Sequence, residues 1–263
     1  PEPFYANYNG FAQASDVKVI PVTSKIEDNF ALPSIELFEK KINNRTKAIL
    51  ICNPCNPTGY VYSKEEIINI ANLAKKNDLF IIVDEVYREF IYSNLKHFSI
   101  LEDETFFDNA ILIDSTSKRY SLCGARIGFI VSKNSKFIET CMKFALARLS
   151  PPTVALIAAN NALKSDNKYI DNVIKEYSMR RKVLIGERSK IDNIEFSDPM
   201  GAFYSIIKLP VKNAEEFAKF LLTDFSINNE SVMLAPAAGF YSSTDNGKDC
   251  LLYTSPSPRD CKT

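Results

Sequence analysis

Apolar residues in this chain follow two patterns: short continuous runs, and longer stretches in which they recur every three to four positions. Continuous runs predict buried strands, and periodic stretches predict helices that bury one face. Strands are predicted at 17–22, 46–52, 79–83, 111–113 and 127–131. Helices are predicted at 34–42, 63–77, 134–149 and 153–164. Because strands and helices alternate, this part of the chain is expected to form an α/β domain with a mostly parallel sheet.

The second part of the chain is organised differently. The pattern predicts a long charged helix at 169–191, a strand at 202–209, a helix at 214–225 and a short strand at 232–235. We therefore expect a large domain at residues 1–165 and a smaller α+β domain at residues 166–249, with the long helix as a bridge at its start.

Residues 250–263, CLLYTSPSPRDCKT, depart from both patterns. They combine closely spaced breakers with no clear periodicity, so they do not resemble the continuation of an α/β domain. We expect this tail to be non-native sequence, produced by a frame error or a cloning or sequencing artefact. The sequence also begins at Pro1 rather than at methionine, so further residues are expected upstream.

Composition excludes several classes of protein. The chain has 263 residues, of which 46% are hydrophobic, which is enough for a sizeable core. Its 32 basic and 32 acidic residues are balanced, and no basic stripe predicts binding to nucleic acid. Its apolar runs are too short to cross a bilayer. We therefore expect a cytoplasmic protein with neither nucleic acid nor membrane as a partner.

The six cysteines and the single histidine predict no metal centre. Cys52 and Cys55 form one C-x-x-C, which can be a redox or zinc motif, but no second cysteine pair lies nearby. We therefore expect buried thiols of a reducing compartment. His97 is expected to be a surface or packing residue. Because it is the only histidine, hydrolysis by a Ser-His-Asp or Cys-His arrangement is not expected.

Three polar loops follow predicted strands. They span residues 53–59, 84–87 and 115–126. In open parallel sheets, ligands bind beyond the carboxyl ends of the strands. The sequence therefore predicts one site assembled from three loops.

The third loop has the chemistry to hold a phosphate and present an amine beside it. Lys118 follows a cluster of hydroxyl residues, and Arg126 lies between two glycines. Lys118 can form a Schiff base with an aldehyde. Ser115, Ser117 and Arg126 can hold a phosphate, since the arginine fork suits its oxygens.

The other loops complete a site for a phosphorylated pyridine aldehyde. Asp84 can pair with a protonated ring nitrogen, which keeps the ring an electron sink. Tyr87 and Asn56 can hydrogen-bond the ring hydroxyl, and Tyr5 can stack on the ring. Each residue also has a simpler role, as a turn residue for Asp84 and Asn56 or in packing for Tyr87. The joint occurrence at three strand ends favours the site.

These loops resemble the signature blocks of a known family. Residues 53–59 (NPCNPTG), 84–87 (DEVY) and 115–118 (STSK), together with the glycine-flanked Arg126, resemble the blocks of class I/II aminotransferases. These are pyridoxal-phosphate (PLP) enzymes of fold type I. The resemblance covers about residues 1–249 and looks most like the bacterial aspartate-aminotransferase subgroup. It implies a three-layer, mostly parallel sheet with helices on both faces, plus a smaller α+β C-terminal domain.

The resemblance also implies roles for individual residues. It implies Lys118 and Tyr87 as catalytic residues, and a cofactor held by Tyr5, Asn56, Asp84, Tyr87, Ser115, Lys118 and Arg126. Tyr5 lies in P-x-Y-x-x-Y at residues 3–8, similar to the ring-stacking block. Residues 201–204 (GAFY) resemble the small-domain strand that faces the substrate.

The implied activity is amino transfer between an amino acid, aspartate or another common one, and a 2-oxo acid such as 2-oxoglutarate. A homodimer with its sites at the subunit interface is also implied. Two alternatives remain open: a PLP-dependent lyase or decarboxylase of the same fold, and a non-catalytic regulator domain that senses PLP.

The chain departs from the family pattern at both ends. Family members have an N-terminal segment whose backbone amides bind the phosphate, and the sequence starts after it. They also place an arginine for the substrate carboxylate near the C-terminus. Arg259 lies in no matching motif, so it receives no role. We therefore expect the chain as given to bind cofactor weakly and to be inactive.

Overall fold

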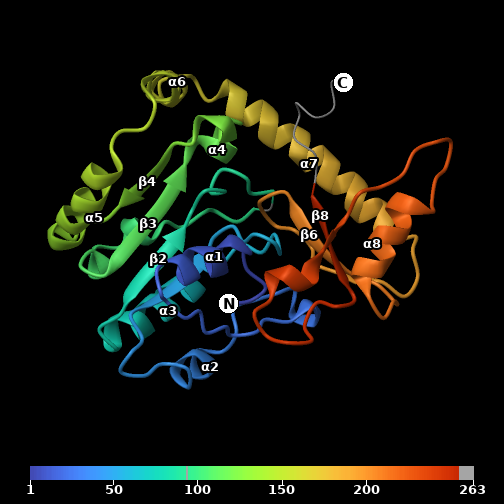
Figure 1. Cartoon of the computed structure of the whole chain (residues 1–263), viewed down its shortest axis with the longest axis horizontal. Helices are drawn as coiled ribbons and strands as arrows, with labels where there is room; N and C mark the ends of the chain where they lie inside the picture. The colour runs from blue at the N-terminus through green and yellow to red at the C-terminus, as the bar shows by residue number, and fades with distance from the viewer. Residues whose placement is uncertain (93, 255–263) are drawn as a thin grey trace.

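The larger of two sheets contains four strands in the order β1-β2-β3-β4 (Figure 1). The computed structural model describes residues 1–92 and 94–254. The strands are β1 (Ala48–Cys52), β2 (Phe80–Asp84), β3 (Ala110–Ser115) and β4 (Gly128–Val131). The first three are parallel, and β4 is antiparallel to β3. The prediction of an α/β domain with a mostly parallel sheet is confirmed.

Helices cover both faces of this sheet. On one face, α3 (Lys64–Lys76) packs against the fully buried side chains of Ile81 and Val83 in β2. Phe80 points to the opposite face, because side chains alternate along a strand. There its ring centre lies 5.5 Å from that of Phe137 in α5 (Ser135–Arg148). The predicted capping box from Ser63 to Glu66 is confirmed at the start of α3.

A long helix joins the two sheets. After α6 (Thr153–Leu163), α7 (Lys168–Arg188) runs across the molecule to the smaller sheet (Figure 1). That sheet is antiparallel, with the order β5-β6-β8-β7, and α8 (Ala214–Thr223) lies beside it. Its strands are β5 (Glu195–Phe196), β6 (Tyr204–Lys208), β7 (Ala235–Pro236) and β8 (Cys250–Thr254).

The remaining helices are short. They are α1 (Asn7–Ala14), α2 (Ile35–Glu39), α4 (Thr116–Arg119), and 3-10 helices at Ile26–Asp28, Ile100–Glu102, Glu104–Phe106, Cys123–Ala125 and Ala237–Phe240. Within the described part of the chain, no helix has the length and apolar content required to cross a membrane.

Three local predictions were wrong, one in full and two in extent. Residues 17–22 form no strand, and the isolated bridge between Glu2 and Thr23 lies just after them. The proline in that stretch lacks the N–H that a ladder needs, and no neighbouring strand supplies partners. The helix predicted at 34–42 already ends at Glu39. The strand predicted at 232–235 is shorter and later, since β7 contains only Ala235 and Pro236.

The segment that starts at Cys250 differs from its prediction. Residues 250–254 form β8, a central strand that pairs with β6 on one side and β7 on the other. Leu251 and Leu252 are buried in it. The predicted boundary at residue 249 therefore falls one residue before a strand, because a partner strand turns a short apolar run into sheet. Residues 255–263 lie outside the described residues, and the non-native origin of the tail stays a prediction.

Candidate active site

The three predicted loops lie together because they leave one edge of the parallel sheet. Cys52 is in register with Asp84, and Asp84 with Ile113. Backbone hydrogen bonds extend this pairing into the loops: the Asn53 amide donates to Asp84 and the Glu85 amide to Ile113, each over 2.9 Å. The carboxyl ends of β1, β2 and β3 are therefore held side by side.

Lys118 lies on α4, directly after β3. The Ser115 hydroxyl caps this helix by accepting a hydrogen bond from the Ser117 amide over 3.0 Å. The Lys118 amine lies 5.7 Å from the ring centre of Tyr87 and 5.8 Å from that of Phe203. Within the described residues, the amine forms neither a hydrogen bond nor an ion pair.

The surroundings of this amine favour its neutral form. Burial lowers the pKa of Lys118, the nearby Asp84 carboxylate partly opposes that effect, and the Arg126 guanidinium adds to it. A lysine that gives up its proton more easily is a better nucleophile. The charges of Asp84 and Arg126 therefore both act on the Lys118 amine.

Asp84 ends β2 as a largely enclosed carboxylate. Its Oδ2 accepts a hydrogen bond from the Tyr8 hydroxyl over 2.7 Å, and its Oδ1 accepts one from the Val86 amide over 3.2 Å. Burial raises the pKa of Asp84, and the bond from Tyr8 opposes this rise. No side-chain cation pairs with it directly in the part of the chain described, so a protonated ring nitrogen would supply the missing positive charge.

Tyr87 and Asn56 belong to the loops that follow the paired strands β2 and β1. Tyr87 is 2% exposed, and its hydroxyl oxygen lies 2.6 Å from that of Tyr204. Asn56 is buried, and its Oδ1 has no hydrogen-bond partner among the described residues. A buried amide oxygen without a hydrogen-bond partner is costly, so this oxygen is suited to accept a hydrogen bond from a ligand.

The residues predicted to hold a phosphate lie around the start of α4. The Ser115 and Ser117 hydroxyl oxygens are 2.8 Å apart, and Ser115 also bonds the Ile127 carbonyl over 2.9 Å. Arg126 has a left-handed backbone with φ of 57° and an exposed side chain. Its Nη1 donates to the Cys123 carbonyl over 2.8 Å, which fixes the guanidinium near the loop.

Tyr5 lies at the rim of this group. Its ring meets that of Tyr8 edge to face at 5.5 Å, and its hydroxyl accepts a hydrogen bond from Asn7. Because Tyr8 in turn bonds Asp84, Tyr5 is joined to the site through one intervening ring. The structure thus brings all eight predicted residues to one region, with Tyr5 and Arg126 at its outer parts.

Three residues of the site were not predicted as cofactor or catalytic residues. Tyr8 and Tyr204 hydrogen-bond Asp84 and Tyr87, and Phe203 faces Lys118. The motifs P-x-Y-x-x-Y and GAFY contain them, but spacing alone does not say which hydroxyl meets which partner. His97, which was predicted to be a surface or packing residue, is partly buried, and its Nε2 lies 2.9 Å from the fully buried carboxylate of Glu85.

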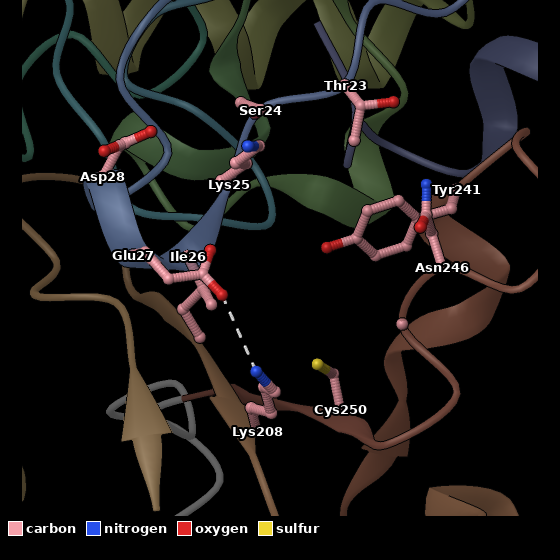
Figure 2. Close-up of a pocket in the computed structure, with 11 residues that line it drawn as sticks. Thr23, Ser24, Lys25, Ile26, Glu27, Asp28, Lys208, Tyr241, Asn246 and Cys250 are labelled. Carbon is pink, nitrogen blue, oxygen red and sulfur yellow. Dashed lines mark ion pairs between the residues drawn. The ribbon is translucent and has the colours of Figure 1, made fainter.

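A hollow elsewhere in the described structure does not coincide with this group of residues. It has a volume of about 500 Å³ and is lined by residues 23–28 on one side and by Lys208, Tyr241 and Cys250 on the other. Lys208 and Glu27 form an ion pair there, at 3.7 Å (Figure 2). None of the predicted site residues line it. Nor do the described residues contain a group of three or more His, Cys, Asp or Glu side chains placed to hold a metal ion.

Comparison with known families agrees with this geometry. The family model described as aminotransferase class I and II matches residues 1–237. The chain belongs to this family. This match confirms, at the family level, the resemblance seen in the sequence. The class I/II aminotransferases are PLP-dependent.

Individual relatives are longer than this chain. An aspartate aminotransferase of Pyrococcus abyssi is 33% identical over 86% of this chain and 59% of its own length. The crystal structure of an aspartate aminotransferase from Thermotoga maritima matches with a TM-score of 0.85 and 28% identity, over 98% of this chain and 64% of that one. An alanine aminotransferase from Pyrococcus furiosus gives 0.83 and 30%, over 97% and 64%. The chain therefore spans about three fifths of the length of these relatives.

The residues of this aminotransferase-family chain fit the family's cofactor. The fit rests on the unpartnered Oδ1 of Asn56, the unpaired amine of Lys118 and the enclosed carboxylate of Asp84. These three groups match a ring hydroxyl, an aldehyde and a protonated ring nitrogen, respectively.

Proposed function

We propose that this protein is a PLP-dependent aminotransferase that moves an amino group between an amino acid and a 2-oxo acid. The observation that carries this proposal is the amine of Lys118, which is unpaired, lies beside the adjacent rings of Tyr87 and Phe203 and is close to Asp84. An aspartate-like or other common amino acid, with 2-oxoglutarate as acceptor, is the proposed substrate pair. A cytoplasmic homodimer is the proposed form.

The cofactor, when bound, would supply an aldehyde and an electron-withdrawing ring that stabilises negative charge on the substrate carbon. Asp84 would hold the ring nitrogen, and Tyr87 and Asn56 the ring hydroxyl. Ser115, Ser117 and Arg126 would hold the phosphate, and Tyr5 would cover a ring face.

Lys118 would have two tasks. Its amine would bind the aldehyde in the resting protein, and after displacement by substrate it would carry the proton from the substrate α-carbon. The rings of Tyr87 and Phe203 suit this role. Burial beside them lowers the pKa of Lys118, which favours the neutral amine with its lone pair free to react.

The decisive test uses purified full-length protein loaded with PLP. Wild type is expected to absorb in the visible range. It is expected to form at most one 2-oxo acid per site from the amino acid alone, and to form more only when an acceptor 2-oxo acid is present. Lys118→Ala is expected to lose the visible band and to lower activity by a factor on the order of 10³ or more.

Lys64→Ala is the matched control. Lys64 also lies over an aromatic ring, 5.0 Å from the centre of Phe98, but belongs to the start of α3. This variant is expected to keep the band and the activity. Formation of more than one product per site without an acceptor would instead identify a lyase or decarboxylase. The absence of any visible band in wild type would refute the proposal.

A further inference from the structure

The two phenols of Tyr87 and Tyr204 form a buried pair. Their oxygens are 2.6 Å apart and their ring centres 5.5 Å apart, and the residues are 2% and 8% exposed. Such a pair shares one proton in one hydrogen bond. The hydroxyl that accepts keeps its own proton, which it can donate to a third group.

Backbone contacts fix the position of Tyr204. Just before it, the Gly201 amide donates to the Gly59 carbonyl and the Ala202 amide to the Phe90 carbonyl, each over 2.9 Å. A Cβ on Gly59 would lie 2.7 Å from the Tyr204 carbonyl oxygen, which is too close for any other residue. The start of β6 is therefore held directly against two of the site's loops.

The environment of the pair is mostly aromatic. The ring of Phe203 stacks on Tyr177 at 5.0 Å and lies 4.9 Å from Tyr204. Burial raises the pKa of Tyr87 and of Tyr204 well above the usual tyrosine value, so both phenols keep their protons at neutral pH. A hydrogen bond in such surroundings is stronger than one in water.

Other titratable groups face the pair from several elements. They are Asp84 and Cys52 at the strand ends, Lys118 on α4, Tyr5 before α1 and Tyr177 on α7. Burial raises the pKa of Cys52. The charge of Asp84 adds to the rise in the pKa of Tyr87, and the Lys118 amine lies over the Tyr87 ring.

We infer that Tyr204 is a positioning residue, which donates its proton to Tyr87 so that Tyr87 directs its own proton to the ring oxygen of the cofactor. This rests on the proposed function, in which Tyr87 must donate. If Tyr204 accepted the hydrogen bond instead, the Tyr87 proton would be directed to Tyr204 and could not be donated to the ring oxygen. Because a hydroxyl that accepts a hydrogen bond becomes a better donor, Tyr204 strengthens the bond from Tyr87.

The test is the pH midpoint of the visible band of PLP bound through Lys118 in the full-length protein. Donation from Tyr87 withdraws charge from the ring oxygen and so lowers this midpoint. Tyr204→Phe is expected to raise it by roughly half a pH unit to one unit. Tyr87→Phe is expected to raise it further, and the double variant is expected to match Tyr87→Phe alone.

Replacement of Tyr204 by a fluorinated tyrosine keeps the hydroxyl and nearly the same side-chain size, and changes the strength of the hydrogen bond. Its more acidic phenol is a stronger donor, so the midpoint is expected to move down. Tyr92→Phe is the matched control, because the Tyr92 hydroxyl donates to the Ala202 carbonyl at the same junction. That variant is expected to lower the melting temperature and to leave the midpoint unchanged.

An unchanged midpoint in Tyr204→Phe would overturn the inference, as would an equal shift in the Tyr87→Phe background. A thermal-unfolding cycle of the same variants without cofactor would then show coupling through structure alone. Failure of the proposed function is distinguishable, since wild type would then show no band that depends on Lys118.

Discussion

The hydroxyl of Tyr8 donates to Oδ2 of Asp84 over 2.7 Å, which joins α1 to the end of β2 across 76 residues of sequence. Burial raises the pKa of Asp84, and this hydrogen bond opposes the rise. Tyr8 therefore helps to keep Asp84 ionised at the point where the proposed function requires a negative charge.

Removing the Tyr8 hydroxyl is expected to weaken cofactor binding. In Tyr8→Phe the pKa of Asp84 rises further, so the acid limb of the activity profile moves to higher pH. Because hydrogen bonds to charged groups contribute about 1.5–3 kcal/mol, PLP affinity is expected to fall by roughly tenfold or more. Titration of the cofactor-free protein with PLP measures this.

Tyr60→Phe is the control for that experiment. The Tyr60 hydroxyl also donates to a carboxylate, Glu66 at the start of α3, over 3.1 Å. It is expected to leave PLP affinity and the pH profile unchanged. Equal affinities of Tyr8→Phe and wild type would contradict the role of Tyr8.

Lys118→Met is expected to stabilise the cofactor-free protein while abolishing activity. Because burial lowers the pKa of Lys118 below its usual 10.5, the unfolded chain binds the proton more tightly than the folded one. In wild type this contribution to the free energy of unfolding rises with pH between the lowered pKa and 10.5. The gain in Lys118→Met is therefore largest at neutral pH, roughly 1 kcal/mol, and shrinks toward alkaline pH. Urea unfolding at several pH values measures it, and a loss of stability at neutral pH would contradict it.

Gly59→Ala is expected to destabilise the protein where the two sheets meet. Gly59 has a φ of 73°, and a Cβ there would lie 2.6 Å from the Cβ of Pro199. The backbone strain and the overlap together are expected to cost at least about 1–3 kcal/mol. Gly186→Ala, within α7 and with nothing within 4 Å of its added Cβ, is expected to stabilise by about 0.5–1 kcal/mol. Thermal unfolding compares the two, and similar effects of both would refute the explanation.

Arg119 is expected to be the costliest charge to remove near the site. It is buried next to Lys118, with Nε 2.7 Å from Glu89 and Nη2 2.8 Å from Asp114. Arg88 also pairs with both carboxylates, at 3.2 Å from Glu89 and 3.3 Å from Asp114. Arg119→Ala leaves them with this one, more exposed cation, which is expected to cost about 1–3 kcal/mol of unfolding free energy.

The exposed pair of Lys76 and Glu39, at 2.9 Å, is the contrast to Arg119. Lys76→Ala is expected to change stability by less than about 1 kcal/mol, because water screens exposed charges. Chemical denaturation of both variants decides the point, and a loss below 1 kcal/mol in Arg119→Ala would show that the buried network contributes little.

The sequence by itself determined the strands, the capped helix and the meeting of three loops. Continuous apolar runs such as the one ending at Asp84 predict buried strands, and Ser63 with Glu66 predicts a helix start, because burial and capping act over a few residues. Parallel strands then bring their carboxyl ends to one edge, which is why Lys118 was predicted beside Asp84.

Only the tertiary structure decided which side chains complete the site. Tyr8 meets Asp84 across 76 residues and Tyr204 meets Tyr87 across 117, and no local pattern encodes which hydroxyl finds which partner. Similarly, residues 250–254 become a strand, whereas residues 17–22 do not, because only the former have neighbouring strands to bond. Partner choice depends on the packing of distant segments. The same packing places the unpaired amine of Lys118 beside the rings of Tyr87 and Phe203, which are distant from it in sequence.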